Sequence, residues 1–281
     1  MRLKIRRILA LCFAIFFAFS LCGCWSSSEI NKMAFVMGIG IDKGEGDEMF
    51  EVTVQIVRIS GLKSSGGEGQ GMGAGGKAYI NICRSGEGIQ MPMRDIARFI
   101  DRELYTGHNQ VIVIGSEVAK GNIAPILDFF IRSADGRFTV ALLIAKGRAY
   151  DILDHSSEME NLPATYLQSL IGERANGGNA PDATMISFLR DMLSSTTAPT
   201  IPIVEVVEDE KGEAQVILIG MGVFRGAGMC GVLRPEEAQA VLAVKNWESE
   251  YPHLEVCFGV ETVLLGSGAI LKPLTPSAEA D

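Results

Sequence analysis

The chain has 281 residues, 7% of them aromatic, and a formal net charge of −9 from 25 basic and 34 acidic side chains. This acidic balance disfavours nucleic acid and anionic lipid headgroups as partners, because both carry negative charge. The length is sufficient for two domains.

Residues 1–23 have the three parts of a secretory signal. Four basic residues precede the apolar stretch 8–21, and the small residue Gly23 stands directly before Cys24. As a helix the apolar stretch would extend only about 21 Å, whereas a transmembrane helix needs about 20 residues. We therefore interpret residues 1–23 as a cleaved leader and not as a membrane span.

The end of this leader fits the signal of a bacterial lipoprotein. Leu21 lies three positions before Cys24, and cleavage between Gly23 and Cys24 would leave a lipidated cysteine as the new N-terminus. The alternative is an ordinary signal peptide that happens to contain cysteines. We predict a diacylglyceryl group on Cys24, because two acyl chains give lasting membrane attachment. Loss of four basic residues with the leader lowers the net charge from −9 to −13.

A β-hairpin is predicted directly after the linker 24–33. The apolar runs 34–41 and 49–59 flank a turn of glycine and aspartate. In the second run, apolar residues alternate with polar ones, which predicts one face on the core and the other partly wet. The glycine-rich segment 61–77 is interpreted as a surface loop. A phosphate-binding loop would open a helix, but a strand-like segment, 78–83, follows it.

Helices and strands then alternate. The apolar spacing predicts an amphipathic helix over residues 88–104 that packs on a sheet. The further elements predicted in this region are strands at 110–115 and 138–145 and helices at 123–131, 150–153, 159–170 and 184–193. We assign residues 34–197 to an N-terminal mixed α/β domain.

A second hairpin is predicted from residues 203–207 and 214–224. The helix predicted at 235–247 begins with Pro-Glu-Glu, which suits a helix N-terminus. We predict a second, smaller α/β domain over residues 198–265. The expected fold class is α+β, or mixed α/β, with two domains of mixed β-sheets flanked by helices.

The histidines do not indicate a metal or catalytic site. His108, His155 and His253 lie far apart in the sequence and lack metal-ligand spacing. We interpret His108 as a structural residue at the entrance to a strand. Asp42 stands before Lys-Gly and is interpreted as a turn residue.

Two pairs of carboxylates have the chemistry of the acid pair that cleaves glycosides, Asp151 with Asp154 and Glu158 with Glu160. The favoured interpretation of these residues is a solvated helix face. There is no Gly-x-Ser-x-Gly motif for a serine esterase. We therefore expect no catalytic residue, no cofactor, no metal and no enzymatic activity.

Three further cysteines follow Cys24 in the chain. Cys83, Cys230 and Cys257 lack the C-x-x-C spacing of metal and redox sites. Their apolar or small neighbours favour buried thiols. A disulfide between two of them is possible on the exported side of a membrane, but the sequence does not decide the pairing.

An ordered series of short motifs resembles a known family. The motifs are Gly-Cys-Trp at 23–25, Glu-Ile-Asn at 29–31, Gly-Ile-Gly-Ile-Asp-Lys at 38–43, Val-Thr-Val-Gln at 52–55, and the segments 107–115 and 121–130. Together they resemble the Ger(x)C proteins, the lipoprotein C subunits of nutrient germinant receptors in endospore-forming bacteria. Agreement covers most of residues 22–170 and continues more loosely over 222–233.

The resemblance implies partners and a location. It implies A-type and B-type membrane subunits of a germinant receptor, on the outer face of the inner spore membrane. It also implies a third, C-terminal domain, which we expect to be missing, with residues 266–281 as a tail or as its start. The alternatives are a solute-binding lipoprotein of an importer and a lipid-anchored hydrolase. Low aromatic content and the lack of repeated βα units disfavour the first, and no motif supports the second.

Overall fold

The protein is described from a computed structural model. The described residues are 5–7, 13, 32–46, 49–58, 77–133, 135–155, 160–176, 180–208, 214–250, 260–265 and 268–273, with the backbone alone for 243–250 and the last two ranges. By internal contacts the chain divides into two units, Met1–Met33 and Ala34–Asp281. The second unit, together with Lys32 and Met33, which lead into its first strand, contains the sheet and the helices that pack on it.

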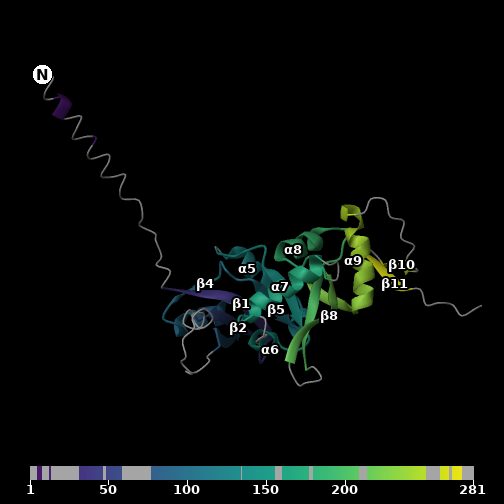
Figure 1. Ribbon diagram of the computed structural model, residues 1–281, viewed down its shortest axis with the longest axis horizontal. Helices are drawn as coiled ribbons and strands as arrows, with labels where there is room; N and C mark the ends of the chain where they lie inside the picture. The colour runs from purple at the N-terminus through teal and green to yellow at the C-terminus, as the bar shows by residue number, and fades with distance from the viewer. Residues whose placement is uncertain are drawn as a thin grey trace, which may run out of the picture. The chain divides into compact units, whose positions relative to one another are not determined.

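A nine-stranded mixed sheet is the main element of the described residues (Figure 1). Its strands are β1 (Met33–Lys43), β2 (Met49–Val57), β3 (Tyr79–Glu87), β4 (Glu103–Tyr105), β5 (Val111–Gly115), β6 (Ala141–Ala145), β7 (Thr200–Glu208), β8 (Ala214–Arg225) and β9 (Gly228–Leu233). The strand order is β3-β2-β1-β5-β6-β7-β8-β9, and β4 pairs with β1. Strands β1, β5, β6 and β7 are parallel, and the outer pairs are antiparallel. A separate hairpin joins β10 (Val260–Leu265) to β11 (Gly268–Pro273).

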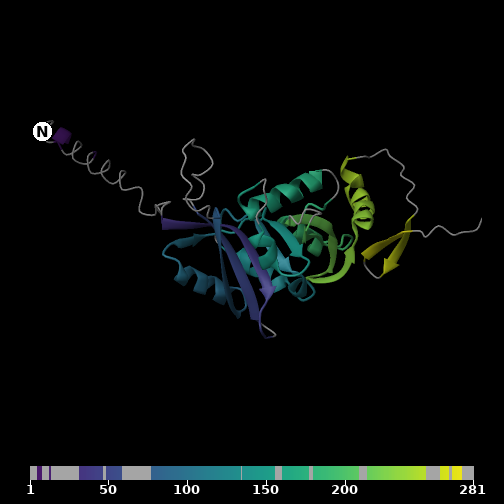
Figure 2. The ribbon, with the colours of Figure 1, turned by 60° about the horizontal axis from the view of Figure 1, so that its bottom comes forward.

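Helices pack on both faces of the sheet (Figure 2). They are α3 (Gln90–Phe99), α4 (Ser116–Ala119), α5 (Ala124–Arg132), α6 (Ala149–Asp154), α7 (Pro163–Asn176), α8 (Met185–Leu193) and α9 (Pro235–Glu250). Helices α3, α5 and α8 cover the first face, which carries Ile39 and Ile41. Helices α6 and α7 cover the second face. The predicted mixed α/β class, with helices flanking a mixed sheet, is confirmed.

Strand β2 has the predicted alternation, and its middle is buried on both faces. Val52, Val54 and Ile56 enter the core of the first face. Thr53 and Gln55 point to the second face and are also 0% exposed. The predicted partly wet face is confirmed at Glu51 and Val57, which are half-buried, whereas α6 and α7 bury the middle of this face.

The helix predicted over residues 88–104 is shorter than expected. Helix α3 ends at Phe99, and Ile100 is extended with ψ 150°. Residues 103–105 then form β4 beside β1. The apolar spacing of Ile100 and Leu104 continues the helical pattern, but both side chains reach the same core from extended backbone.

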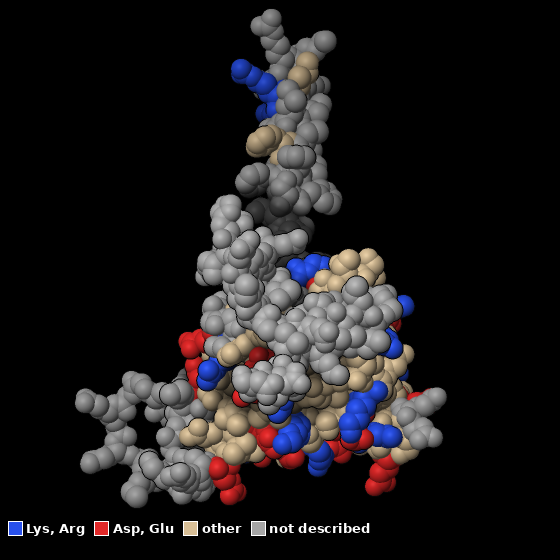
Figure 3. Space-filling view, turned by 90° about the vertical axis from the view of Figure 1, so that its right-hand side faces the viewer, with Lys and Arg blue, Asp and Glu red and all other residues tan. Residues whose placement is uncertain are grey.

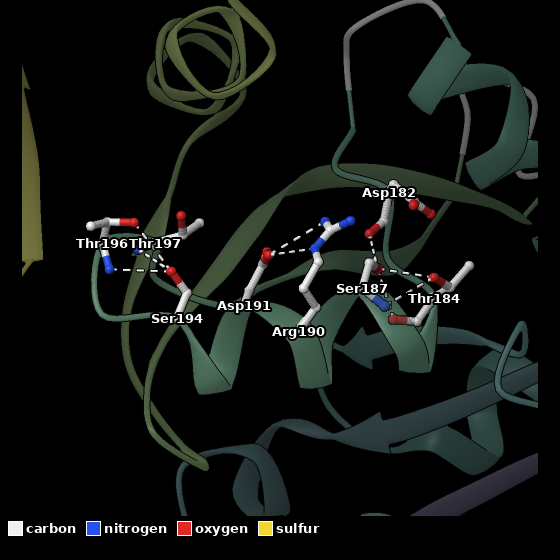
Figure 4. Close-up of polar contacts among 8 residues, drawn as sticks. All are labelled: Asp182, Thr184, Ser187, Arg190, Asp191, Ser194, Thr196 and Thr197. Carbon is white, nitrogen blue, oxygen red and sulfur yellow. Dashed lines mark hydrogen bonds and ion pairs between the residues drawn. The ribbon is translucent and has the colours of Figure 1, made fainter. Parts of the chain in front are cut away.

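One hydroxyl side chain caps the start of α8, and another forms a turn after its end (Figure 4). At the N-terminus, the Oγ1 atom of Thr184 accepts the N–H of Ser187 at 3.3 Å. After the C-terminus, the Oγ atom of Ser194 accepts the N–H groups of Thr196 and Thr197, both at 3.2 Å. The Thr184 cap explains the agreement between the start of α8 and that of the predicted helix 184–193, because it occupies a backbone donor in the first turn.

The sheet continues across the predicted domain boundary at residues 197 and 198. Strand β7 pairs in parallel with β6, with Ile144 opposite Ile203. Strands β8 and β9 extend the same sheet. The division into two domains and the missing third domain stay predictions.

Candidate functional site

The glycines of the motif Gly-Ile-Gly-Ile-Asp allow α6 to pack closely against the second face of the sheet. A Cβ atom at Gly38 would lie 3.0 Å from the side chains of Leu153 and Ala164. At Gly40 it would lie 3.0 Å from Leu153 and 3.2 Å from Ala149. Both distances are shorter than ordinary van der Waals contact. The two glycines are therefore needed so that α6 and the start of α7 can lie directly on β1.

Asp42 caps α6 from the end of the same strand. Its Oδ1 atom accepts the N–H of Ala149 at 2.7 Å, and its Oδ2 atom accepts the N–H of Tyr150 at 3.0 Å. The side chain is only 4% exposed. Arg148, the residue at the N-cap position of α6, supplies no side-chain cap of its own. The interpretation of Asp42 as a local turn residue was wrong, because its carboxylate binds a helix that begins 107 residues later.

Burial and hydrogen bonding act on this carboxylate in opposite directions. Loss of solvent raises the pKa of Asp42, whereas the N–H donors of Ala149 and Tyr150 and the charge of Arg148 lower it. The net direction is upward. Asp42 thus pays a desolvation cost to stabilise two backbone donors in the first turn of α6.

Asp42 lies at the place where many α/β proteins bind an anionic ligand. Such ligands sit beyond the carboxyl ends of parallel strands, where successive connections leave toward opposite faces of the sheet. Here β5 leads to α5 on the first face, and β6 leads to α6 on the second. At Gly115, the last residue of β5, an added Cβ would collide with Asp42, and Ser116 donates its N–H to the carbonyl of Gly147 at 3.1 Å. The chain's own carboxylate and backbone bonds occupy this position.

The other end of α6 is bound by a buried glutamine of β2. Gln55 donates its Nε2–H to the carbonyl of Leu153 at 2.7 Å and accepts the N–H of Ala164 at 3.0 Å. It also donates to Oδ1 of Asn81 at 3.2 Å. Asn81 in turn donates to the same Leu153 carbonyl at 3.1 Å. One amide therefore joins the end of α6 to the start of α7.

Strand β3 completes this network at Asp154. The hydroxyl of Tyr79 donates to the Asp154 carbonyl at 2.9 Å, and Lys77 forms an ion pair with its carboxylate at 2.8 Å. Asn81 also donates to that carboxylate at 3.2 Å. Burial raises the pKa of Tyr79, which keeps its hydroxyl protonated and able to donate. We call the contacts of Asp42, Gln55 and Asn81 with α6 the α6 clamp.

Sequence reasoning did not single out Gln55, Asn81 or Tyr79 as a group. Gln55 closes the motif Val-Thr-Val-Gln, and a long polar side chain between the apolar residues Val54 and Ile56 is the signal that could have indicated a buried network. Its partners are 26 and 98 residues away. Only the folded chain brings them together.

The proposed acid pairs are not brought together as a reaction centre. Asp151 is exposed in the first turn of α6, whereas Asp154 binds Lys77 and Asn81 at the end of that helix. Glu158 lies outside the described residues. These contacts agree with the favoured interpretation of a helix face for Asp151 and give Asp154 a structural role.

His108 belongs to a cluster of three rings at the start of β1. Its ring centroid lies 5.5 Å from those of Phe35 and Tyr105, which are 5.9 Å apart. Two residues further on, Gln110 joins two strands through its backbone. It donates its N–H to the carbonyl of Met37 at 2.9 Å, and its carbonyl accepts the N–H of Ala141 at 3.0 Å. The segment therefore links β1 to β6, in agreement with the structural interpretation.

The cysteines differ from one another in exposure. Cys83 is half-buried, and burial raises the pKa of its thiol. Cys230 is exposed on β9, so the buried-thiol expectation was wrong for it. Both are free thiols in the described part of the chain. Cys257 lies outside the described residues, as do Gly23, Cys24 and His253.

An open groove of about 1050 Å³ lies on the first face between α3 and α5. Phe50, Met91 and Phe129 supply its apolar lining, and the ion pair of Asp128 with Arg132 stands at its edge. Among the described residues, no group of three or more histidine, cysteine or acidic side chains could hold a metal. In the space-filling view, acidic and basic side chains are intermixed on the face shown (Figure 3). None of the described helices combines the length and apolarity of a membrane span.

These observations define the described unit as a mixed α/β protein in which residues of the motifs at 38–43 and 52–55 join helices to the sheet. The chain belongs to the Ger(x)C family of spore germination proteins. The family profile described as "Spore germination protein N-terminal domain" matches residues 26–206, more than half of the chain. The resemblance noted from the sequence motifs is thereby confirmed.

Three relatives from Bacillus subtilis (strain 168) are similar to this chain. YfkR is 27% identical over 229 residues, which cover 80% of this chain and 58% of YfkR. Spore germination protein YndF is 35% identical over 167 residues, 53% of this chain and 41% of YndF. Spore germination protein B3 is 24% identical over 228 residues, 80% of this chain and 58% of B3. The chain thus spans about half the length of these relatives. No solved structure gives a significant match.

Proposed function

We propose that this chain is a non-enzymatic, lipid-anchored subunit of a nutrient germinant receptor, which assembles with A-type and B-type subunits at the inner spore membrane. The observation that carries the proposal is the family match over residues 26–206. Relatives in the same comparison include spore germination proteins KC, B3 and A3. The chain would act through contacts with protein partners.

The chemistry of the α6 clamp supports a role without catalysis. Asp42 and Gln55, two buried polar side chains that could serve a reaction, are each bound to backbone groups of the chain. A catalytic carboxylate must reach a substrate, typically at about 2.6–3.2 Å. Both carboxylate oxygens of Asp42 instead accept backbone N–H groups of α6.

The anchor is proposed on the residues that precede the folded unit. Leu21 and Gly23 stand at the positions that a lipoprotein signal requires before Cys24. A diacylglyceryl group there would retain the chain on the membrane without a spanning helix. Only eight residues separate Cys24 from Met33, the start of β1.

The proposal is tested in spores that carry Cys24→Ala in place of the native gene copy, with Cys230→Ala as the matched control because Cys230 is an exposed thiol on β9. We expect Cys24→Ala to abolish incorporation of labelled palmitate, to release the chain from the membrane fraction and to slow nutrient germination. The control should retain all three properties. Normal nutrient germination of spores that lack the gene would contradict the receptor role, and labelled Cys24→Ala protein would contradict the anchor.

The importer alternative makes a different prediction. A solute-binding lipoprotein needs two lobes around a ligand cleft, whereas the described strands β1 to β9 form one continuous sheet. Calorimetric titration of the chain from residue 25 onward with amino acids and sugars separates the two functions. Tight binding together with undisturbed germination of the deletion strain would favour the importer.

A further inference from the structure

Apolar and aromatic side chains gather at one end of the sheet, where the parallel strands begin. Phe35 lies near the start of β1, and His108 and Phe138 each precede the next parallel strand, β5 or β6, by three residues. Tyr105 belongs to β4, which pairs with β1. We call Phe35, Tyr105, His108, Phe138 and Ile186 the N-terminal rim.

Contacts between neighbouring segments bring the members of this rim to the same end of the sheet. The rings of Phe35, Tyr105 and His108 are packed with centroids 5.5 to 5.9 Å apart. The loop before β5 and the loop before β6 lie side by side, because residues of both line one small cavity of about 10 Å³. Ile186 donates its N–H to the carbonyl of Phe138 at 2.9 Å, which joins the start of α8 to the same surface.

The rim is partly open to solvent. His108 is exposed, Phe138 is 46% exposed and Ile186 is 55% exposed, while Phe35 and Tyr105 are half-buried. Contiguous exposed apolar side chains indicate a contact surface. Rings with a polar tip, such as tyrosine and histidine, suit a boundary between an apolar phase and water. Such rings are enriched at the level of lipid headgroups.

The length of the tether selects this rim over the opposite end of the sheet. From Cys24 to Met33 the chain extends at most about 32 Å, at roughly 3.3–3.6 Å per residue. Strand β1 has 11 residues and is therefore about 33 Å long. If the far end of the sheet rested on the bilayer, the tether would have to be almost fully extended along the length of β1. The N-terminal rim needs no such extension.

We propose that the N-terminal rim rests on the lipid surface, with its rings at the level of the headgroups. The proposal rests on the proposed lipid anchor at Cys24, which supplies the tether. The contact uses apolar and aromatic groups, so it does not require anionic lipids, which the net charge of −13 after leader removal would repel. The alternative occupant of the rim is a membrane-embedded protein partner, and the experiment distinguishes this partner from lipid.

The test places a single tryptophan at the rim and reads its quenching by brominated lipid. Trp25 and Trp247, the two tryptophans of the chain, are replaced by phenylalanine. Phe138→Trp then reports on the rim, and Met91→Trp is the control at the opposite end, where Met91 is 51% exposed. The chain from residue 25 onward is held on phosphatidylcholine vesicles by an N-terminal histidine tag and a nickel-chelating lipid, so the test does not depend on lipidation.

We expect brominated acyl chains to reduce the emission of Phe138→Trp by about twofold, and to leave Met91→Trp nearly unchanged, because indole at the headgroup level reaches the upper acyl chain. His108→Trp serves as a second rim reporter and should behave like Phe138→Trp. Circular dichroism confirms that each variant is folded. Equal quenching at both ends, or no quenching of either rim reporter, would overturn the proposal. Quenching that requires a reconstituted B-type subunit would also overturn it and would assign the rim to a protein partner.

Lipidation is measured separately, by the mass of the full chain expressed in a bacterium. A chain without diacylglyceryl on Cys24 would remove the anchor from the proposed function, whereas the quenching result would still decide whether the rim contacts lipid. The two failures are therefore distinguishable.

Discussion

Replacement of Asp42 is the most direct test of the α6 clamp. Asp42→Ala leaves the N–H groups of Ala149 and Tyr150 without their acceptor in a site that is 4% exposed. Each buried donor that loses its partner costs about 1–3 kcal/mol, and release of a buried carboxylate offsets part of the sum. We expect a net loss of about 2–4 kcal/mol in the free energy of unfolding.

Asp42→Asn separates charge from hydrogen bonding. The amide oxygen can keep one N–H bond, but the amide nitrogen would face the second N–H, so we expect a loss of about 1–3 kcal/mol. Asp151→Asn is the matched control, because Asp151 is exposed in the same helix turn and exposed substitutions usually change stability by less than about 0.5 kcal/mol. Urea unfolding of the chain from residue 25 onward measures all three variants.

The pH dependence of this difference has a defined sign. The pKa of Asp42 is raised in the folded chain, mainly by burial. The folded state therefore binds this proton more tightly than the unfolded state, so the contribution of Asp42 to stability decreases as pH rises from the ordinary aspartate pKa through the raised one. The difference in the free energy of unfolding between wild type and Asp42→Asn should be larger at the acidic end of that window.

An Asp42→Ala variant as stable as the Asp151→Asn control would refute the clamp.

Three further predictions concern the same unit. Gly40→Ala should cost about 1–3 kcal/mol by overpacking against α6, whereas Gly231→Ala, with open space around the added Cβ, should be neutral in the same urea assay. Gln55→Ala should destabilise by about 1–3 kcal/mol, since it orphans the buried N–H of Ala164 and removes one of the two donors to the Leu153 carbonyl; an unchanged midpoint would disprove this. Cys230 should react with a thiol reagent faster than Cys83, whose pKa burial raises; equal rates would contradict the assigned exposures.

The clamp explains why two of the sequence motifs occur together. The glycines of 38–43 allow α6 to approach β1, and Asp42 in the same motif caps the start of that helix. Gln55, the last residue of Val-Thr-Val-Gln, binds its end. These two motifs are thus parts of one structural device that fixes α6 on the sheet.

Local sequence patterns were sufficient for many elements. Period-two alternation in 49–59 predicted β2. The helix predicted at 184–193 corresponds to α8, Met185–Leu193. The prediction failed where tertiary contacts overrode local spacing. Residues 103–105 continue a helical pattern but form β4, because β1 offers an unpaired edge at that point.

The sequence by itself determined the family and the mixed α/β class, and it predicts the anchor at Cys24, because each depends on residues close together in the chain. Only the tertiary structure decided the role of Asp42 and Gln55. Asp42 binds residues 107 and 108 positions away, and Gln55 binds the carbonyl of Leu153, 98 positions away. No local pattern contains a partner at that distance. A buried polar group is paired only when folding brings a complementary group to it.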